Sequence, residues 1–312
     1  HQVILDQQPI ALERIDLTAL PASEREPALA QQVQTVTARP FDLRHGPLLR
    51  ASLFALADEE FVLVVSMHHI VSDGWSMDVM VKEFVQCYQA FSLEREPQLP
   101  ALALQYADYA IWQRRWLEAG EGERQLDYWR QQLGEEHPLL EVAPDFARPL
   151  TQSFEGQTLS FDFGADLSRQ LNAFARSQGI SLFMLVLAGF SLFVSRHAGQ
   201  RDIRVGVPNA NRGRAEVEGL IGFFVNTQVL RCEVDERGSF TDLLARVREA
   251  SFGAQAHQEL PFEQLVDELV AERTLGHNPL FQVKFNQNVG MQKQRAMALP
   301  GLSVAEYPLD KD

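Results

Sequence analysis

The chain has few cysteines, no excess of basic residues and no apolar run long enough to cross a membrane as a helix. Its two cysteines, Cys87 and Cys232, are too few for a disulfide framework or a zinc cluster, so we expect a reducing compartment and no metal. Lys and Arg number 28 against 42 Asp and Glu, which gives a formal net charge of −14. Such an acidic chain is a poor candidate for binding nucleic acid or an anionic membrane, because both require a basic surface.

The longest apolar run, from Leu182 to Val194, is shorter than the roughly 20 residues that a membrane-spanning helix needs. No charged-then-apolar leader opens the chain, so the sequence predicts a cytoplasmic protein. A hydrophobic content of 46% and a charged content of 22% are ordinary for a globular protein. The length of 312 residues suggests about two domains or one large duplex domain.

Apolar periodicity predicts two mixed α/β lobes. Leu48–Leu56 and Phe61–Met67 are apolar runs separated by an acidic turn, which predicts a β-hairpin. Residues 137–149 hold three prolines and little periodicity, which suits a crossing between lobes. We therefore expect a first lobe over residues 1–150 and a second lobe over residues 151–312. Further strands are predicted at Gln157–Phe163, Asp202–Val207, Phe223–Val234 and Leu280–Asn286, and helices near Met77–Phe91, Tyr106–Leu117, Glu123–Leu133, Leu167–Ala175, Leu182–Val194, Ser239–Gln255 and Phe262–Val270.

The segment Met67–Ser76 carries the most informative chemistry. It leaves a hydrophobic strand and leads into a helix, so a rigid strand end would hold polar side chains beside an accessible loop. On extended backbone, His68 and His69 point to opposite sides, so they are not expected to bind one metal together. A single imidazole there can deprotonate or orient an attacking amine or hydroxyl group.

Two residues further along the same loop support this interpretation, although an ordinary structural role stays open for each. Asp73 can orient the imidazole or fix the loop by pairing with an arginine, and Gly74 permits a turn that exposes its N–H to an oxyanion. A His-His pair beside a core strand is more often a packing feature, and Asp-Gly is common in turns. No Gly-x-Ser-x-Gly elbow, P-loop or Gly-x-Gly-x-x-Gly motif competes for the role.

Five segments, in the correct order, resemble the motifs of condensation domains from non-ribosomal peptide synthetases. His68–Gly74 matches the His-His-x-x-x-Asp-Gly signature of that family. The other four are Tyr106–Arg114, Ile221–Thr227 (resembling Ile-Gly-x-Phe-Val-Asn-Thr), His257–Leu265 and Asn278–Val283. Two early motifs of the family are absent, so we expect a fragment that begins inside the first lobe and stops before the second is complete.

The resemblance implies a fold, a reaction and partners. The fold is two chloramphenicol-acetyltransferase-like lobes arranged as a V, with the signature loop at their junction. The implied reaction is amide-bond formation, in which the amine of an acceptor aminoacyl thioester attacks a donor aminoacyl or peptidyl thioester. Upstream and downstream carrier domains bring both substrates on phosphopantetheine, and an adenylation domain is the expected neighbour. No metal and no directly bound cofactor are implied.

The resemblance also assigns roles to single residues. His69 is the position that deprotonates or orients the amine, and Gly74 offers its N–H near the thioester carbonyl. His68 and Asp73 are implied to support the site structurally, and we expect Asp73 to pair with Arg212. Four further residues are candidates for the wall of the substrate tunnel: Trp75, Ser76, Asn226 and Asn278.

The sequence differs from two related families, and two alternative functions remain open. Epimerisation domains lack the continuation through Trp75 and Ser76, and heterocyclisation domains replace the signature histidines with aspartates. Residues Ile70–Met77 resemble family members that accept a D-configured donor residue more than members of the all-L class. One alternative function is a non-catalytic platform that recruits carriers or tailoring enzymes, although such members tend to lose the signature histidines. Another is a free-standing acyltransferase that uses an acyl thioester and a small-molecule amine or alcohol.

Overall fold

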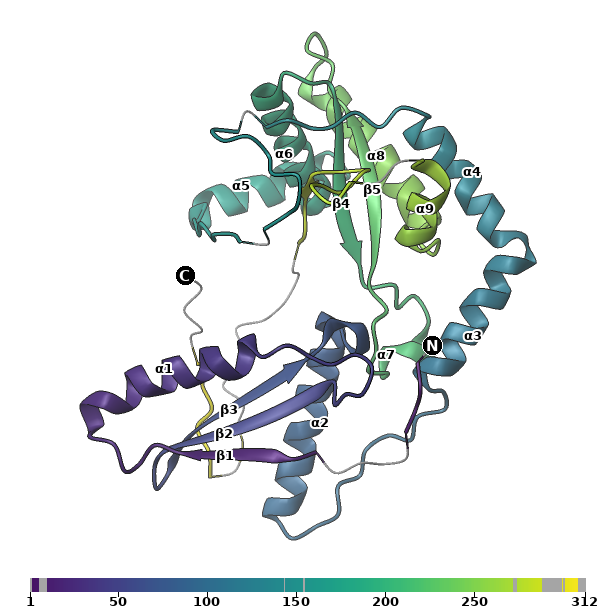
Figure 1. Cartoon of the computed structure of the whole chain (residues 1–312). Coiled ribbons are helices and arrows are strands. Elements are labelled where there is room, and N and C mark those ends of the chain that lie inside the picture. The colour runs from purple at the N-terminus through teal and green to yellow at the C-terminus, as the bar shows by residue number, and fades with distance from the viewer. Residues whose placement is uncertain are drawn as a thin grey trace. The chain divides into compact units, whose positions relative to one another are not determined.

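A computed structural model of the chain describes residues 2–5, 10–142, 144–153, 155–271, 274–287, 299 and 301–307 (Figure 1). The chain divides into two compact units. The first unit comprises His1–Ala103, Glu218–Phe223 and Lys293–Asp312, and the second comprises Leu104–Val217 and Phe224–Gln292. The lobe boundary expected near residue 150 lies inside the second unit and does not coincide with the change of unit at residue 103; as a boundary between family lobes it remains a prediction.

The first unit is built on a three-stranded sheet in the order β1-β2-β3. β1 (Leu12–Asp16) runs parallel to β2 (Leu49–Ala57), and β2 pairs antiparallel with β3 (Glu60–Met67). α1 (Ala22–Ala38) covers one face of this sheet (Figure 1). Its Leu29 and Val33 belong to the same buried hydrophobic cluster as Phe54 of β2. The predicted β-hairpin is confirmed as the β2–β3 pair.

The segment after β3 changes direction through two capped turns. β3 leads into the 3₁₀-helix η1 (His69–Val71), and α2 (Gly74–Ser92) follows. His68 caps η1, because its Nδ1 accepts the backbone N–H of Ile70 at 3.0 Å. Asp73 caps α2, because its Oδ1 accepts the backbone N–H of Ser76 at 2.8 Å. The predicted strand, loop and helix are therefore all present, and each turn satisfies a backbone donor that would otherwise lack an acceptor.

The second unit contains a sheet in the order β5-β4-β6. Its strands are β4 (Asp202–Asn209), β5 (Asn226–Glu233) and the short β6 (Val283–Lys284). α6 (Leu182–Ala198) and α8 (Phe240–Ala256) pack with β4 and β5 in one hydrophobic core (Figure 1). The remaining helices are α3 (Tyr106–Trp116), the π-helix η2 (Leu117–Glu121), α4 (Gly122–Leu133), α5 (Gly164–Ser177), α7 (Ala215–Glu218) and α9 (Phe262–Leu269). The predicted mixed α/β class is confirmed.

Three expectations about strands are corrected. The predicted strand Gln157–Phe163 has no regular secondary structure and pairs with no described strand, and Leu159 is 87% and Phe161 75% exposed. A segment with alternating apolar and polar residues forms a strand only where a neighbouring strand supplies its hydrogen bonds. The predicted strand Phe223–Val234 begins at Asn226 instead, and residues 280–286 contribute only the two residues of β6.

Both cysteines are free, but they differ in burial. Cys232 is 1% exposed and belongs to the hydrophobic core of the second unit, and burial raises the pKa of its thiol to about 11. Cys87 is only partly buried on α2. Within the ranges given above, no group of three or more His, Cys, Asp or Glu side chains is placed to hold a metal ion.

A test for membrane-spanning helices finds no single helix that qualifies among the described residues. Helices α5 and α6 reach the required length and apolar composition only when they are counted as one span. The chain bends by 105° between them.

Candidate functional site

The two signature histidines differ in how their rings are held. Nδ1 of His68 is occupied by the N–H of Ile70, and the His68 ring meets Phe41 edge-on at 5.8 Å between centroids. His69 is exposed, and no described residue forms a hydrogen bond with either of its ring nitrogens. The His69 ring instead packs against Phe223, with centroids 5.1 Å apart and ring planes at 73°. Both ring nitrogens of His69 therefore lack a partner among the described residues, whereas Nδ1 of His68 is committed to the backbone of its own loop.

The first turn of α2 is tied to residues 218–223. Asp73 is 4% exposed, and its Oδ1 lies 2.8 Å from the backbone nitrogen and 2.7 Å from Oγ of Ser76. Ser76 is fully buried, and its Oγ also lies 2.9 Å from the carbonyl oxygen of Gly222. Nε1 of Trp75 donates to the carbonyl oxygen of Glu218 at 2.8 Å. The polar atoms of Trp75 and Ser76 thus hold this turn together, and their place on a tunnel wall stays a prediction.

Gly74 is the first residue of α2 and is exposed. Its φ is not positive, so this turn does not depend on the conformational freedom of glycine. A Cβ atom added at Gly74 would meet nothing within 4 Å, so the space beside its backbone is open. The first N–H groups of a helix have no acceptor within the helix and carry its positive dipole end. This is the setting in which an oxyanion donor, the predicted role of Gly74, can act.

Arg212 lies in the second unit and is 6% exposed. Its Nη1 donates to the carbonyl oxygen of Val217 at 2.7 Å, and its guanidinium carbon lies 4.1 Å from the ring centre of Phe224. These contacts close the loop between β4 and β5 on itself. The expected pairing of Arg212 with Asp73 remains a prediction.

The two predicted asparagines each organise a backbone turn in the second unit. Nδ2 of Asn226 donates to the carbonyl oxygens of Gln258 at 2.8 Å and Leu260 at 2.7 Å. Its Oδ1 accepts the backbone N–H of Phe262 at 3.0 Å. Oδ1 of Asn278 accepts the N–H two residues later at 3.0 Å. Both side-chain groups of Asn226 are therefore used within the protein, and the tunnel roles of the two asparagines stay predictions.

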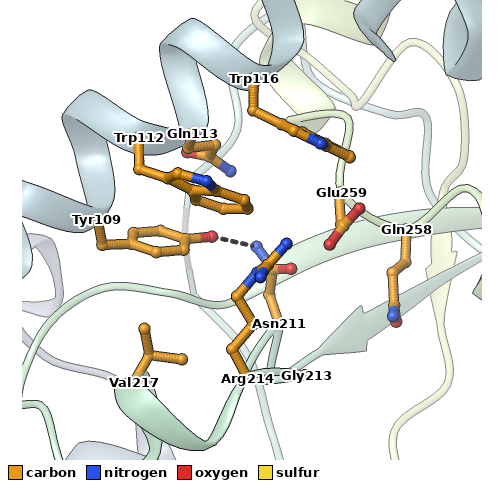
Figure 2. A pocket seen from close by; sticks show the side chains of 10 residues that line it. All are labelled: Tyr109, Trp112, Gln113, Trp116, Asn211, Gly213, Arg214, Val217, Gln258 and Glu259. Atoms are coloured by element: carbon orange, nitrogen blue, oxygen red, sulfur yellow. Dashed lines mark hydrogen bonds between the residues drawn. The ribbon is translucent and has the colours of Figure 1, made fainter.

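A pocket in the second unit was not predicted from the sequence (Figure 2). Trp112 stacks on Trp116 along α3, with centroids 5.6 Å apart, and the guanidinium carbon of Arg214 lies 4.2 Å from the Trp112 ring centre. Nδ2 of Asn211 donates to Oη of Tyr109 at 3.1 Å. The lining residues are Tyr109, Trp112, Gln113, Trp116, Asn211, Gly213, Arg214, Val217, Gln258 and Glu259.

The lining of this pocket suits the binding of aromatic or charged groups. Burial, with the nearby Tyr106 and Glu259 contributing, raises the pKa of Tyr109 to about 12, so its phenol stays protonated at neutral pH. Stacked indole rings and a guanidinium favour flat or charged groups. The aromatic spacing along Tyr106–Trp116 is visible in the sequence, but the residues that complete the pocket come from distant loops.

Comparison with known proteins identifies the family. The model of the condensation domain matches residues 1–309, so the chain belongs to the condensation-domain family, as the five motifs predicted. A linear gramicidin synthase polypeptide from Brevibacillus parabrevis is 47% identical over 294 residues, which is 94% of this chain and 6% of that protein. The chain therefore spans only a small part of this curated relative.

Solved structures share the fold. The complex of the X-domain and OxyB from teicoplanin biosynthesis matches with a TM-score of 0.82 and 30% identity, over 91% of this chain and 62% of that chain. The four-domain nonribosomal peptide synthetase holo-AB3403, bound to AMP and glycine, matches with a TM-score of 0.81 over 95% of this chain and 22% of that chain. At 23% identity, the second match speaks for the fold alone.

Proposed function

We propose that the chain forms an amide bond between two thioester substrates that carrier domains present on phosphopantetheine. The amine of the acceptor aminoacyl group attacks the carbonyl carbon of the donor aminoacyl or peptidyl thioester. A C–N bond forms, the C–S bond breaks, and the proton lost by the amine balances the thiol that leaves on the donor carrier. The observation that carries the proposal is the exposed His69 ring, whose nitrogens have no hydrogen-bond partner in the described chain, within the family signature.

In this proposal, His69 acts on the amine as a base or as an orienting acceptor. An imidazole that no carboxylate or backbone group holds can accept a hydrogen bond from an incoming amine without first breaking one. General-base assistance of this kind contributes about 10²–10⁴-fold to a rate. His68 and Asp73 support the loop through their contacts with Ile70 and Ser76.

The N–H of Gly74 is proposed to stabilise the oxyanion that develops on the donor carbonyl. The open space at Gly74 gives room for a carbonyl oxygen to approach the start of α2. Donors fixed before reaction are effective because they need no reorganisation as charge develops. Trp75 and Ser76 would then hold this turn in place through their contacts with residues 218–223.

The experiment follows donor transfer by intact-mass spectrometry, using the protein that contains this chain and two loaded carrier domains. We expect His69→Ala to lower the transfer rate by about a hundredfold or more. His45→Ala, which changes an exposed histidine in the same unit, is the matched control and should transfer at the wild-type rate. Equal transfer by wild type and His69→Ala would remove His69 from the chemistry. Absence of transfer in wild type, with both carriers bound, would favour a recruitment platform instead.

The platform is the second candidate because one structural relative, the X-domain of teicoplanin biosynthesis, is solved in complex with OxyB. A platform would bind a partner protein without needing the two free nitrogens of His69. A free-standing acyltransferase is the third, and it would transfer the acyl group to a small amine or alcohol in the absence of any acceptor carrier. The same mass assay, run without the acceptor carrier, separates this case.

The proposal extends to the donor, the neighbours and the compartment. We propose a D-configured donor residue because of the sequence of Ile70–Met77. Transfer assays with donor carriers that are loaded with D- or L-aminoacyl groups test this directly. An adjacent adenylation domain would load the acceptor carrier. Two free cysteines fit a reducing compartment, and we place the protein in the cytoplasm.

A further inference from the structure

The ring of His69 has one described aromatic neighbour, Phe223. Their centroids lie 5.1 Å apart and their planes meet at 73°, which is the edge-to-face geometry that aromatic pairs favour. The two residues belong to different motifs, and 154 positions separate them in the sequence. Both lie in the first unit.

The orientation of His69 is not set by hydrogen bonds within the described chain. A reactive histidine is commonly fixed by a carboxylate or carbonyl that accepts its second ring N–H. No described residue makes such a bond with His69, whereas Nδ1 of His68 is held by Ile70 at 3.0 Å. His69 is also exposed and begins a 3₁₀-helix of only three residues, so its backbone provides little steric restraint on the ring. Among the described residues, the edge-to-face contact with Phe223 is the ring contact that can limit its rotation.

The backbone next to Phe223 is fixed by hydrogen bonds to the first turn of α2. The preceding residue, Gly222, contacts the fully buried Oγ of Ser76 through both its carbonyl oxygen at 2.9 Å and its amide nitrogen at 3.1 Å. Four residues earlier than Gly222, Glu218 accepts a hydrogen bond from Nε1 of Trp75 at 2.8 Å. The backbone that carries Phe223 is thus attached to the same turn of α2 that follows His69.

We infer that Phe223 is a positioning residue for His69, which keeps the imidazole in one orientation by edge-to-face packing. The inference rests on the proposed function, because it matters only if His69 meets the acceptor amine. In the motif Ile-Gly-x-Phe-Val-Asn-Thr that residues 221–227 resemble, Phe223 occupies the variable position. The aromatic ring is therefore a feature of this chain and not a requirement of the motif. Phe223 is 37% exposed, so part of its side chain is also accessible to a substrate.

The first test measures the contact without using activity. Histidine is labelled with ¹³C and ¹⁵N in the 312-residue chain, and the ring signals of His69 are identified among the eight histidines by their loss in His69→Gln. A phenyl ring at 5.1 Å displaces these signals by its ring current. We expect Phe223→Leu to abolish the displacement and Phe223→Tyr to retain it. Unchanged His69 signals in Phe223→Leu would overturn the inference.

The second test measures the consequence in the transfer assay. We expect Phe223→Leu to lower kcat by roughly two- to tenfold, the range that an edge-to-face pair supports, with little change in KM. Phe223→Tyr should restore kcat, and Phe91→Leu, at an exposed phenylalanine near the other end of α2, should match wild type. Wild-type kcat in Phe223→Leu, with the NMR displacement lost, would refute positioning. If the displacement behaves as expected but wild type transfers nothing, the proposed function fails and the contact stands.

Discussion

The side-chain hydroxyl of Ser76 lies 2.9 Å from the carbonyl oxygen of Gly222 and 3.1 Å from its amide nitrogen. The two residues are 146 positions apart, and Ser76 is fully buried. The same hydroxyl lies 2.7 Å from Oδ1 of Asp73, the N-cap of α2. One small side chain thus joins the turn after the signature histidines to a later motif. This is one reason why residues 218–223 group with the first unit while the flanking chain groups with the second.

Replacing Ser76 with alanine is expected to lower the free energy of unfolding by about 1–3 kcal/mol, because the N–H of Gly222 would be left buried without this acceptor. Urea denaturation followed by circular dichroism measures the loss. Ser92→Ala is the matched control, since the hydroxyl of Ser92 bonds the carbonyl oxygen of Gln89 at 3.0 Å but is exposed. The control should change stability by no more than about 0.5 kcal/mol. Equal losses in the two variants would show that Ser76 does not join the two segments.

Asn226→Asp tests the turn at the start of β5. The substitution replaces an amide that donates to the carbonyl oxygens of Gln258 and Leu260 with a group that, when ionised, can only accept. Leaving both carbonyls facing an acceptor is expected to cost about 2–4 kcal/mol of unfolding free energy. Asn172→Asp serves as the control, because its Nδ2 also donates to a backbone carbonyl, that of Ser168, at an exposed site. Similar denaturation midpoints for the two variants would contradict this role of Asn226.

The sequence was sufficient where structure depends on neighbouring residues. The apolar run Phe61–Met67 and the helical spacing of Met77–Phe91 predict β3 and α2. The apolar run Leu182–Val194 likewise predicts α6, whose N-cap Ser181 accepts the N–H of Met184 through its Oγ at 3.2 Å. Each of these features is set by interactions within a few positions of chain, which a local pattern records.

The sequence was insufficient where distant segments decide the outcome. Phe223 was predicted to start a strand, yet β5 begins at Asn226. Phe223 instead packs against His69, and the preceding Gly222 contacts Ser76. The pocket beside α3 needs Arg214 and Glu259 from separate loops, and no spacing in the sequence relates them to Trp112. The alternation of Gln157–Phe163 is a sound strand signal, but no described strand pairs with it.

Gly74→Ala tests whether Gly74 is needed to leave space for the substrate or to allow the chain to fold. Because Gly74 does not have a positive φ and its Cβ would meet nothing within 4 Å, alanine should fit without strain. We expect stability to stay unchanged or to rise by about 0.4–1 kcal/mol, since alanine reduces the entropy of the unfolded chain. Transfer in the mass assay should nevertheless fall, and Gly74→Leu should lower it further, because the side chain occupies the approach to the N–H. Full transfer in both variants would place the donor carbonyl elsewhere.

The stability of the second unit should depend on pH through His137. Burial, reinforced by the Arg204 guanidinium, lowers the pKa of His137 below its ordinary 6.5. Its Nδ1 lies 2.7 Å from Nη1 of Arg204, and its Nε2 lies 3.1 Å from the carbonyl oxygen of Leu269, which suits a neutral ring that accepts at Nδ1 and donates at Nε2. The unfolded chain therefore binds this proton more readily than the folded chain does. Lowering the pH through 6.5 favours unfolding until the folded ring also protonates.

His137→Gln provides the comparison, because glutamine keeps one acceptor and one donor but does not titrate. Between about pH 7.5 and pH 5.5, the wild-type free energy of unfolding should fall more steeply than that of His137→Gln. The exposed His45→Gln control should retain the wild-type slope. Urea titrations at a series of pH values give the three slopes. Parallel curves for wild type and His137→Gln would mean that the ring takes up its proton equally in the folded and unfolded states, contrary to its contact with Arg204.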